Sequence, residues 1–210
     1  EMWTSKYDMD GNLQWSKSYR LQDSTTGPTD VIADKNGDAY VGGYVEIGGG
    51  GSLSYSLVVK YDAGGTLLWS RQFKFADHNG GKVVKMALAP SDGLYALCQY
   101  GNDDWGLIRL AASGDSLWCV SFDTATTSDW AFDLVLDGAG NAYVCGYFYA
   151  GLEPHNDIAT HKIGADGHFV WTRQFNYGID GAKGVAVDKL GRVYVAGQGI
   201  ISGSTRSRFI

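Results

Sequence analysis

Four residues at matching places in the chain are the first candidates for chemistry. Asp30, Lys85, Asp133 and Gly184 each precede three apolar or small residues that predict a β-strand. If two of these strands bring their carboxylates face to face, Asp30 and Asp133 could hold a cation or a water cluster. The same pair could act as acid and base on a polysaccharide. The structural alternative is that these carboxylates accept hydrogen bonds from backbone N–H groups.

Clusters of Asp, Asn and Gly at residues 8–12, 34–38 and 188–191 superficially resemble calcium loops. Calcium takes about six to eight oxygen ligands, and an EF-hand loop adds a Glu at its twelfth position. None of the clusters supplies that Glu. Because Asp, Asn and Gly tolerate positive φ, hairpin turns account for all three clusters. We therefore predict turns without a metal, and no cofactor apart from a cation at Asp30 and Asp133.

Several aromatic residues lie outside the repeated motifs described below. Trp130 precedes one of the predicted strands, and Tyr147, Phe148 and Tyr149 follow Cys145. Aromatic side chains on loops offer apolar faces to sugars or to partner proteins. The alternative is that they cover the edges of sheets, as many surface aromatic residues do.

Charge and composition limit the classes of partner. The chain has 210 residues, 19% of them charged, and a formal net charge of −6. This argues against nucleic acid as a partner, because nucleic-acid binding needs a clustered Lys/Arg surface. No apolar run approaches the roughly 18 to 20 residues of a membrane helix, and residue 1 onwards shows no signal-peptide layout, so we expect no membrane insertion. Cys98, Cys119 and Cys145 have no disulfide or zinc spacing and are predicted to be small buried hydrophobes.

The elements that position these residues come from a repeat. A polar turn followed by Trp, with an aromatic residue four positions later, occurs four times. The pairs are Trp15 and Tyr19, Trp69 and Phe73, Trp118 and Phe122, and Trp171 and Phe175, and the tryptophans are 54, 49 and 53 residues apart. A fixed period near 50 indicates a repeat architecture.

Two further motifs alternate with the first. One is a pair of short β-rich runs joined by a turn, with Tyr40, Tyr95, Tyr143 and Tyr194 in matching places. The other is a single β-rich run, found at residues 3–7, 57–61, 107–110 and 158–163. Each unit is thus predicted to have four antiparallel strands, with the Trp at the start of the fourth. Because side chains alternate along a strand, the Trp and the later aromatic share one face and should pack on the neighbouring sheet.

Four-stranded units at this period are typical of the blades of a β-propeller. Copies such as 185–197 and 59–70 resemble the bacterial β-propeller repeat called SBBP and, more distantly, NHL repeats. The resemblance implies a secreted or surface-exposed bacterial module, often within a larger protein, and carries no catalytic motif. In an NHL-like arrangement the first strand is innermost, so Asp30, Lys85, Asp133 and Gly184 would surround the mouth of the central channel.

We therefore predict an all-β propeller that occupies residues 1–210 as one domain. It has a half blade at 1–20, blades at about 29–75, 82–122 and 131–175, and a half blade at 183–210. We expect the two halves to complete a closed four-bladed ring, with part of a larger propeller as the alternative.

The predicted function is a non-catalytic binding or scaffold module that uses loops on one face and takes a protein or carbohydrate ligand. The alternatives are a propeller enzyme acting on polysaccharide and a structural unit of an extracellular assembly.

Overall fold

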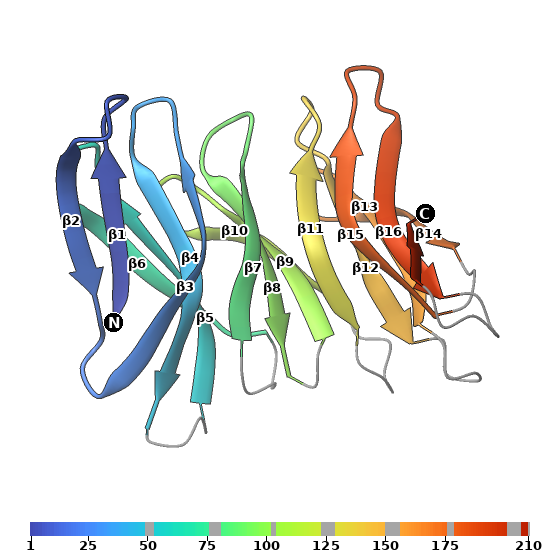
Figure 1. Cartoon of the computed structure of the whole chain (residues 1–210), viewed down its shortest axis with the longest axis horizontal. Coiled ribbons are helices and arrows are strands. Elements are labelled where there is room, and N and C mark those ends of the chain that lie inside the picture. Colours follow the sequence, from blue (N-terminus) through green and yellow to red (C-terminus); the bar gives the residue numbers. More distant parts are fainter. Residues whose placement is uncertain are drawn as a thin grey trace.

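The structure is a computed structural model that describes residues 1–48, 53–75, 81–101, 104–122, 129–149, 156–175, 179–200 and 207–209. The described residues form seventeen β-strands and no helix (Figure 1). The all-β prediction is therefore confirmed. Within these residues, no helix has the length and apolar character needed to cross a membrane.

Twelve of the strands form three antiparallel four-stranded sheets. Blade 1 contains β3 (Ser24–Ala33), β4 (Ala39–Ile47), β5 (Leu53–Tyr61) and β6 (Leu67–Phe73). Blade 2 contains β7 (Gly81–Leu88), β8 (Leu94–Tyr100), β9 (Asp104–Leu110) and β10 (Ser116–Phe122). Blade 3 contains β11 (Trp130–Leu136), β12 (Ala142–Tyr149), β13 (Asn156–Ile163) and β14 (Phe169–Phe175). In each sheet the strands lie in chain order, as in a propeller blade.

Two smaller sheets stand at the ends of the row. The N-terminal sheet pairs β1 (Met2–Tyr7) with β2 (Leu13–Tyr19). The C-terminal sheet contains β15 (Ile179–Val187), β16 (Val193–Ile200) and β17 (Ser207–Phe209).

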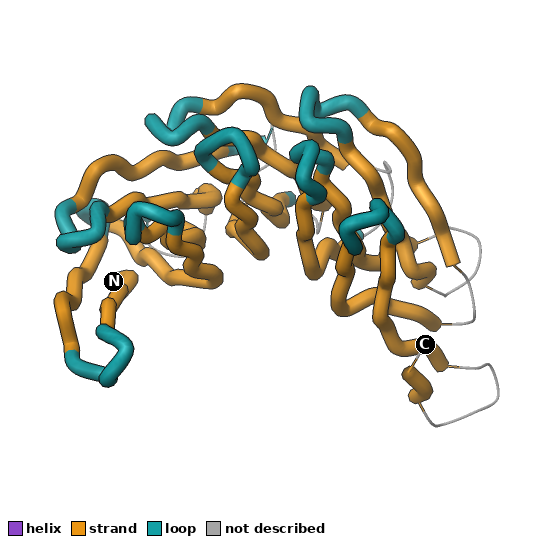
Figure 2. Tube along the Cα trace, turned by 90° about the horizontal axis from the view of Figure 1, so that it is seen from above, coloured by secondary structure: helices purple, strands orange, loops and turns teal. Residues whose placement is uncertain are grey.

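The five sheets form an open arc, with both chain ends on its open side (Figure 2). The expected closed ring would need β1 to pair with β16, but among the described strands β1 pairs with β2 and β16 pairs with β15 and β17. The closed ring is therefore not what this structure shows.

The tight turns of the sheets gather along one edge of the arc. All turns that join first to second strands, and third to fourth strands, lie along the upper edge in Figure 1. The first strands of consecutive sheets, β3, β7, β11 and β15, lie next to one another. They begin at the lower edge (Figure 1). Residues near the start of a first strand, in different blades, are thus brought to the same edge.

The core lies between the sheets. Every residue of β8 and β9 is buried, since both faces of blade 2 are covered by neighbouring blades. The apolar clusters accordingly combine blades: one joins Tyr40 and Val58 of blade 1 to Met86 and Ile108 of blade 2. Burial of this kind is the main stabilising contribution in a propeller, because each sheet is too thin to form a core alone.

Three of the four repeated Trp residues connect one sheet to the next, which confirms for these three the prediction that the Trp packs on the neighbouring sheet. Its indole N–H donates to a backbone carbonyl in the following turn: Trp15 to Ala63 at 3.1 Å, Trp69 to Ala112 at 2.9 Å and Trp118 to Ala165 at 3.1 Å. Two residues beyond each carbonyl is a glycine with positive φ, namely Gly65, Gly114 and Gly167, on which a Cβ would come within 3.0 Å of the indole. We call this contact the Trp clasp.

The Asp/Asn/Gly clusters form tight turns, as predicted. In the first, an Asp8 carboxylate oxygen accepts the backbone N–H groups of Asp10 and Asn12 at 3.0 and 2.8 Å. The bond from the Asn12 backbone is the main reason that the pKa of Asp8 is lowered. The carboxylates of Asp34 and Asp188 accept backbone N–H groups in the same way. In these loops the Asp carboxylate therefore stabilises its own turn by accepting backbone hydrogen bonds.

The three cysteines differ in exposure. Cys98 and Cys145 are buried, and burial raises the pKa of each thiol to about 12. Both therefore behave as small hydrophobes. Cys119 is exposed, so the prediction of a buried residue is wrong there. It lies on β10, the outer strand of blade 2, where a strand residue has fewer neighbours.

Candidate binding face

A β-bulge fixes the place of each of the four residues predicted at the channel mouth. The pairing of first and second strands shifts by one residue at Thr29, Val84, Phe132 and Lys183. Each of the four comes directly after that extra residue and lies inside its first strand, so the prediction that they precede these strands is wrong. A bulge re-aims the side chains around it, and it was not predicted from the sequence.

The two carboxylates of this set bind the backbone of the following sheet. Asp30 Oδ2 accepts the backbone N–H of Met86 at 2.7 Å, and Asp133 Oδ2 accepts that of Val185 at 2.9 Å. Lys85 Nζ lies 4.0 Å from Asp30 Oδ1. These contacts connect neighbouring first strands and match the structural alternative stated for Asp30 and Asp133. A cation shared by the two carboxylates remains a prediction.

Substituting Asp133 should therefore weaken the fold. We expect Asp133→Ala to lower the free energy of unfolding by about 1.5–3 kcal/mol, because a charge-assisted hydrogen bond is lost and the Val185 N–H is left without its acceptor. Urea unfolding followed by tryptophan fluorescence measures this change. Asp10→Ala, at an exposed turn residue, is the matched control and should change stability by less than about 0.5 kcal/mol. Equal effects of the two variants would contradict the linking role.

Three aromatic rings gather where blade 3 meets its neighbours. Trp130 and Phe132 come from β11, and Tyr147 comes from β12. The Trp130 ring lies 6.3 Å from each of the other two ring centroids, at interplanar angles of 26° to Phe132 and 19° to Tyr147. Phe132 and Tyr147 are 5.7 Å apart. All three are half-buried, and we call them the aromatic cluster.

The rings face similar directions because of the strand register. Trp130 and Tyr147 are directly paired across β11 and β12. The bulge residue Phe132 lies two positions after Trp130 and therefore points to the same side. The structure thus brings together Trp130 and Tyr147, two of the aromatic residues predicted on loops, and places both in strands. Phe148 and Tyr149 belong to β12, but their side chains lie outside the described part of the chain.

A lysine from each neighbouring sheet approaches the aromatic cluster. Lys82 of β7 places Nζ 5.8 Å from the Trp130 ring centroid, and Lys183 of β15 places Nζ 3.6 Å from that of Phe132. Both lysines are exposed, so their ammonium groups remain available to a ligand. A cation over an aromatic ring is a favourable contact, which holds each lysine beside the cluster.

A cavity of about 230 Å³ adjoins this cluster on the blade 2 side. It is lined by Tyr44, Glu46, Ser54, Gly81, Lys82, Gln99, Tyr100 and Gly101. Lys82 belongs both to this lining and to the contact with Trp130. The lower edge of blades 1 to 3 therefore carries hydroxyl, amide and charged groups next to aromatic faces, which is a combination typical of saccharide and peptide sites.

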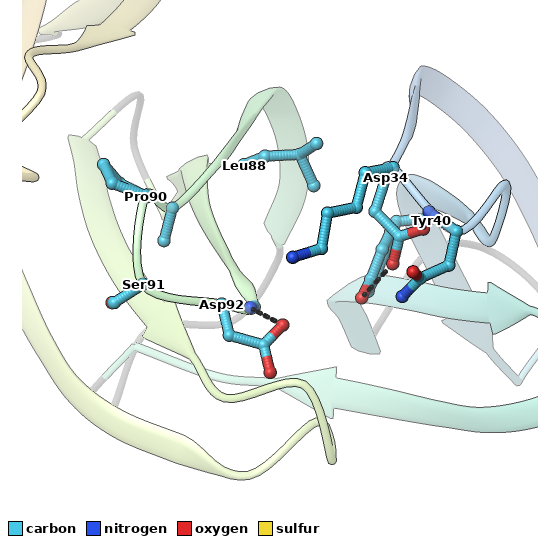
Figure 3. A pocket seen from close by; sticks show the side chains of 10 residues that line it. Asp34, Tyr40, Leu88, Pro90, Ser91 and Asp92 are labelled. Atoms are coloured by element: carbon cyan, nitrogen blue, oxygen red, sulfur yellow. Dashed lines mark hydrogen bonds between the residues drawn. The ribbon is translucent and has the colours of Figure 1, made fainter.

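A larger cleft, of about 610 Å³, lies on the opposite edge, between the first turns of blades 1 and 2 (Figure 3). Its lining includes Asp34, Tyr40, Leu88, Pro90, Ser91 and Asp92. Asp34 accepts hydrogen bonds within its own turn, and Asp92 accepts the N–H of Gly93 at 2.9 Å. The turns thus use these two carboxylates themselves, and Lys35 and Asn36 add an ammonium and an amide group to the lining.

Three residues of the candidate face were missed by sequence reasoning. Phe132, Lys82 and Lys183 lie next to predicted site residues but were assigned to ordinary strands. A signal was present in part: Trp130 and Phe132 are two residues apart, which places both on one face of a strand. The lysines could not be found, since they reach the cluster from different sheets.

Comparison with known proteins bears on the fold alone. No protein-family model matches the chain, and no curated protein matches it. Among solved structures, it is similar to the endo-arabinase from Bacteroides thetaiotaomicron, with 13% sequence identity, a TM-score of 0.47, and coverage of 88% of this chain and 72% of that one. It is also similar to a GH43 beta-1,3-galactosidase, with 13% identity, a TM-score of 0.49, and coverage of 99% of this chain and 45% of that one. The chain is an all-β protein built of propeller blades.

Proposed function

We propose that the chain is a non-catalytic binding module for an acidic polysaccharide, and that the aromatic cluster with Lys82 and Lys183 is its binding site. The observation that carries this proposal is the gathering of three aromatic rings between two lysines of neighbouring sheets. Sugar rings present apolar C–H faces that pack on aromatic rings, and the carboxylate or sulfate groups of an acidic sugar pair with ammonium groups.

The origin of the lysines favours a polymer as ligand. Lys82, the aromatic cluster and Lys183 come from blade 2, blade 3 and the C-terminal sheet in turn. A ligand that contacts both lysines would cross two sheet boundaries, which suits several linked sugar residues. The chain as a whole has a net charge of −6, so attraction of a polyanion depends on these local charges and should weaken as salt screens them.

A catalytic role in polysaccharide hydrolysis is the alternative proposal. That role would need Asp30 and Asp133 as an acid/base pair. Each of these carboxylates instead accepts a backbone N–H group of the following sheet. A secreted or surface location, membership of the SBBP-type repeat family and a place within a larger polypeptide or assembly are also proposals, implied by the resemblance of the repeats. They are compatible with a module that binds extracellular polysaccharide.

Binding of polygalacturonate tests the proposal. We expect measurable binding by isothermal titration calorimetry at 20 mM NaCl, and about tenfold weaker binding by Trp130→Ala, which corresponds to about 1.4 kcal/mol. Trp130→Phe keeps an aromatic face and should retain most of the affinity. Lys183→Ala should weaken binding and reduce its salt dependence. Lys189→Ala, on the opposite edge, is the matched control and should bind like the unmodified chain.

Three outcomes would overturn this assignment. One is equal or tighter binding of neutral arabinan, which would leave the lysines without a role. Another is equal affinity of the Trp130→Ala and Lys189→Ala variants. The third is release of reducing sugar from polygalacturonate by the unmodified chain, which would support the hydrolytic alternative.

A further inference from the structure

The aromatic cluster of blade 3 has a counterpart in blade 1. In blade 3, Trp130 pairs with Tyr147 two positions before the bulge of β11. In blade 1, Gly27 pairs with Tyr44 two positions before the bulge of β3. Tyr44 therefore occupies in blade 1 the place that Tyr147 has in blade 3. Because equivalent places in different blades reach the same edge of the arc, the repeat brings a second aromatic ring to the lower edge.

A glycine makes room for this second ring. The Tyr44 atoms Cε1, Cζ and Oη each lie 2.6 Å from the point where a Cβ of residue 27 would stand. Any side chain on Gly27 would therefore displace the outer end of the tyrosine ring. Tyr44 is half-buried and lines the cavity of about 230 Å³ between blades 1 and 2. The missing side chain of Gly27 thus sets where the ring lies beside this cavity.

The cavity carries one ammonium and one carboxylate group. Lys82 lines it from β7, and Glu46 lines it from β4, two residues after Tyr44 and therefore on the same side of that strand. Within the described part of the chain Glu46 forms no ion pair, so its oxygens can accept hydrogen bonds from a ligand. A carboxylate accepts hydrogen bonds from sugar hydroxyl groups and repels a second carboxylate nearby. The cavity therefore favours a neutral sugar unit over an acidic one.

Lys82 joins the cavity to the aromatic cluster. It lines the cavity, and its Nζ lies 5.8 Å from the Trp130 ring centroid. Strand β7, which carries Lys82, contacts both β3 and β11. Beside it, Ser54 Oγ donates to the Gly81 carbonyl at 3.1 Å and connects blade 1 to blade 2. A polymer that lies on the aromatic cluster and continues past Lys82 therefore reaches the cavity and Tyr44.

We propose that this cavity is a second sugar subsite, in which Tyr44 packs on a neutral sugar unit and Glu46 accepts its hydroxyl groups. The inference rests on the proposed function, since the acidic unit of the same polymer lies on the aromatic cluster between Lys82 and Lys183. It narrows the ligand class to polysaccharides in which neutral and acidic units are neighbours.

The size of the cavity agrees with a single sugar ring. Its volume of about 230 Å³ is below the roughly 300–1,000 Å³ of pockets that hold drug-sized molecules. The remainder of the polymer would then lie outside it, along the lower edge of the arc.

Two oligomers of equal length test the neutral subsite. A hyaluronan octasaccharide alternates glucuronate with N-acetylglucosamine, whereas octagalacturonate is acidic at every unit. We expect isothermal titration calorimetry at 100 mM NaCl, where long-range attraction is screened, to give about tenfold tighter binding of the hyaluronan oligomer. The reason is that only this oligomer can place a neutral unit beside Glu46. Because the two oligomers also differ in linkage, variants of the cavity must locate the preference.

Three variants do so. Tyr44→Ala should weaken hyaluronan binding about tenfold and change octagalacturonate binding by less than about twofold. Gly27→Ala should also weaken hyaluronan binding, although it keeps the tyrosine, because it displaces the ring. Glu46→Gln should instead tighten octagalacturonate binding about threefold, since it removes the repulsion between carboxylates. Tyr7→Ala is the matched control, because Tyr7 is 60% exposed at the end of β1, next to a turn of the upper edge.

Two checks show that the variants fold. Far-ultraviolet circular dichroism reports whether each variant keeps its β-structure. Octagalacturonate binding that survives in Tyr44→Ala and Gly27→Ala shows in addition that the aromatic cluster is intact.

Failure of this inference can be told apart from failure of the proposed function. Equal affinities of Tyr44→Ala and Tyr7→Ala for the hyaluronan oligomer overturn the inference, and so does an unchanged octagalacturonate affinity of Glu46→Gln. The proposed function survives both results if Trp130→Ala still weakens the binding of the two oligomers. If Trp130→Ala binds them like the unmodified chain, or the unmodified chain binds neither, the proposed function fails and the inference fails with it.

Discussion

Replacing Trp69 by Ala is expected to lower the free energy of unfolding by about 2–4 kcal/mol. Trp69 packs edge-on against Tyr40, with ring centroids 5.9 Å apart, and belongs to the apolar cluster that joins blades 1 and 2. Its indole N–H also donates to Ala112 of blade 2 at 2.9 Å. The substitution therefore removes packing within one blade and a hydrogen bond to the next, and it opens a cavity at their boundary.

Two comparison variants separate these contributions. Trp69→Phe keeps an aromatic ring but loses the donor, so it should cost about 1–2 kcal/mol. Trp171→Ala removes the same residue type from blade 3, where no turn of a further sheet lies over it among the described residues. Trp171→Ala should therefore destabilise the chain less than Trp69→Ala does. Urea unfolding followed by circular dichroism measures all three, and equal losses at both positions would show that the clasp contributes nothing.

The fold was largely predictable because its signals are local and repeated. Trp69 and Phe73 mark a fourth strand by their spacing and by the turn before them. Each such strand recurs with a period near 50. An ambiguous strand assignment in one copy of the repeat is therefore resolved by the matching residues of the other copies. The closed ring could not be decided in this way, since the repeats show only that residues 1–20 and 183–210 are half blades. Whether the two half blades meet depends on the curvature of the arc, which the repeat pattern does not encode.

The candidate face was less predictable than the fold. Trp130 and Tyr147 stood out because they depart from the repeat consensus. Phe132 did not: its spacing from Trp130 places the two rings on one face of a strand, but Phe132 fits the repeat and so gave no reason to be singled out. The carboxylates of Asp30 and Asp133 were correctly placed at equivalent positions, but their partners, the backbone N–H groups of Met86 and Val185, carry no sequence signal.

Acid should destabilise the chain through His161. This imidazole lies against Trp105, Phe122 and Phe169, with ring centroids 5.0, 5.2 and 6.1 Å away. Its Nδ1 is 2.9 Å from Thr172 Oγ1. Burial lowers the pKa of His161 from 6.5 to about 4. Between these values the unfolded chain binds a proton that the folded chain does not, so the stability from the neutral ring is present above pH 6.5 and lost as the pH falls towards 4.

The expected loss from this residue is at most about 3 kcal/mol, at 1.36 kcal/mol for each pKa unit. Urea unfolding at pH 7.0 and pH 4.5 measures it as the difference between the unmodified chain and His161→Gln, which has no proton to gain. His168→Gln is the matched control, because the side chain of His168 is 86% exposed. It should lose as much stability at acid pH as the unmodified chain does. If His161→Gln loses as much stability at acid pH as His168→Gln does, the acid sensitivity comes from other groups. The aromatic surroundings of His161 then do not disfavour its protonation.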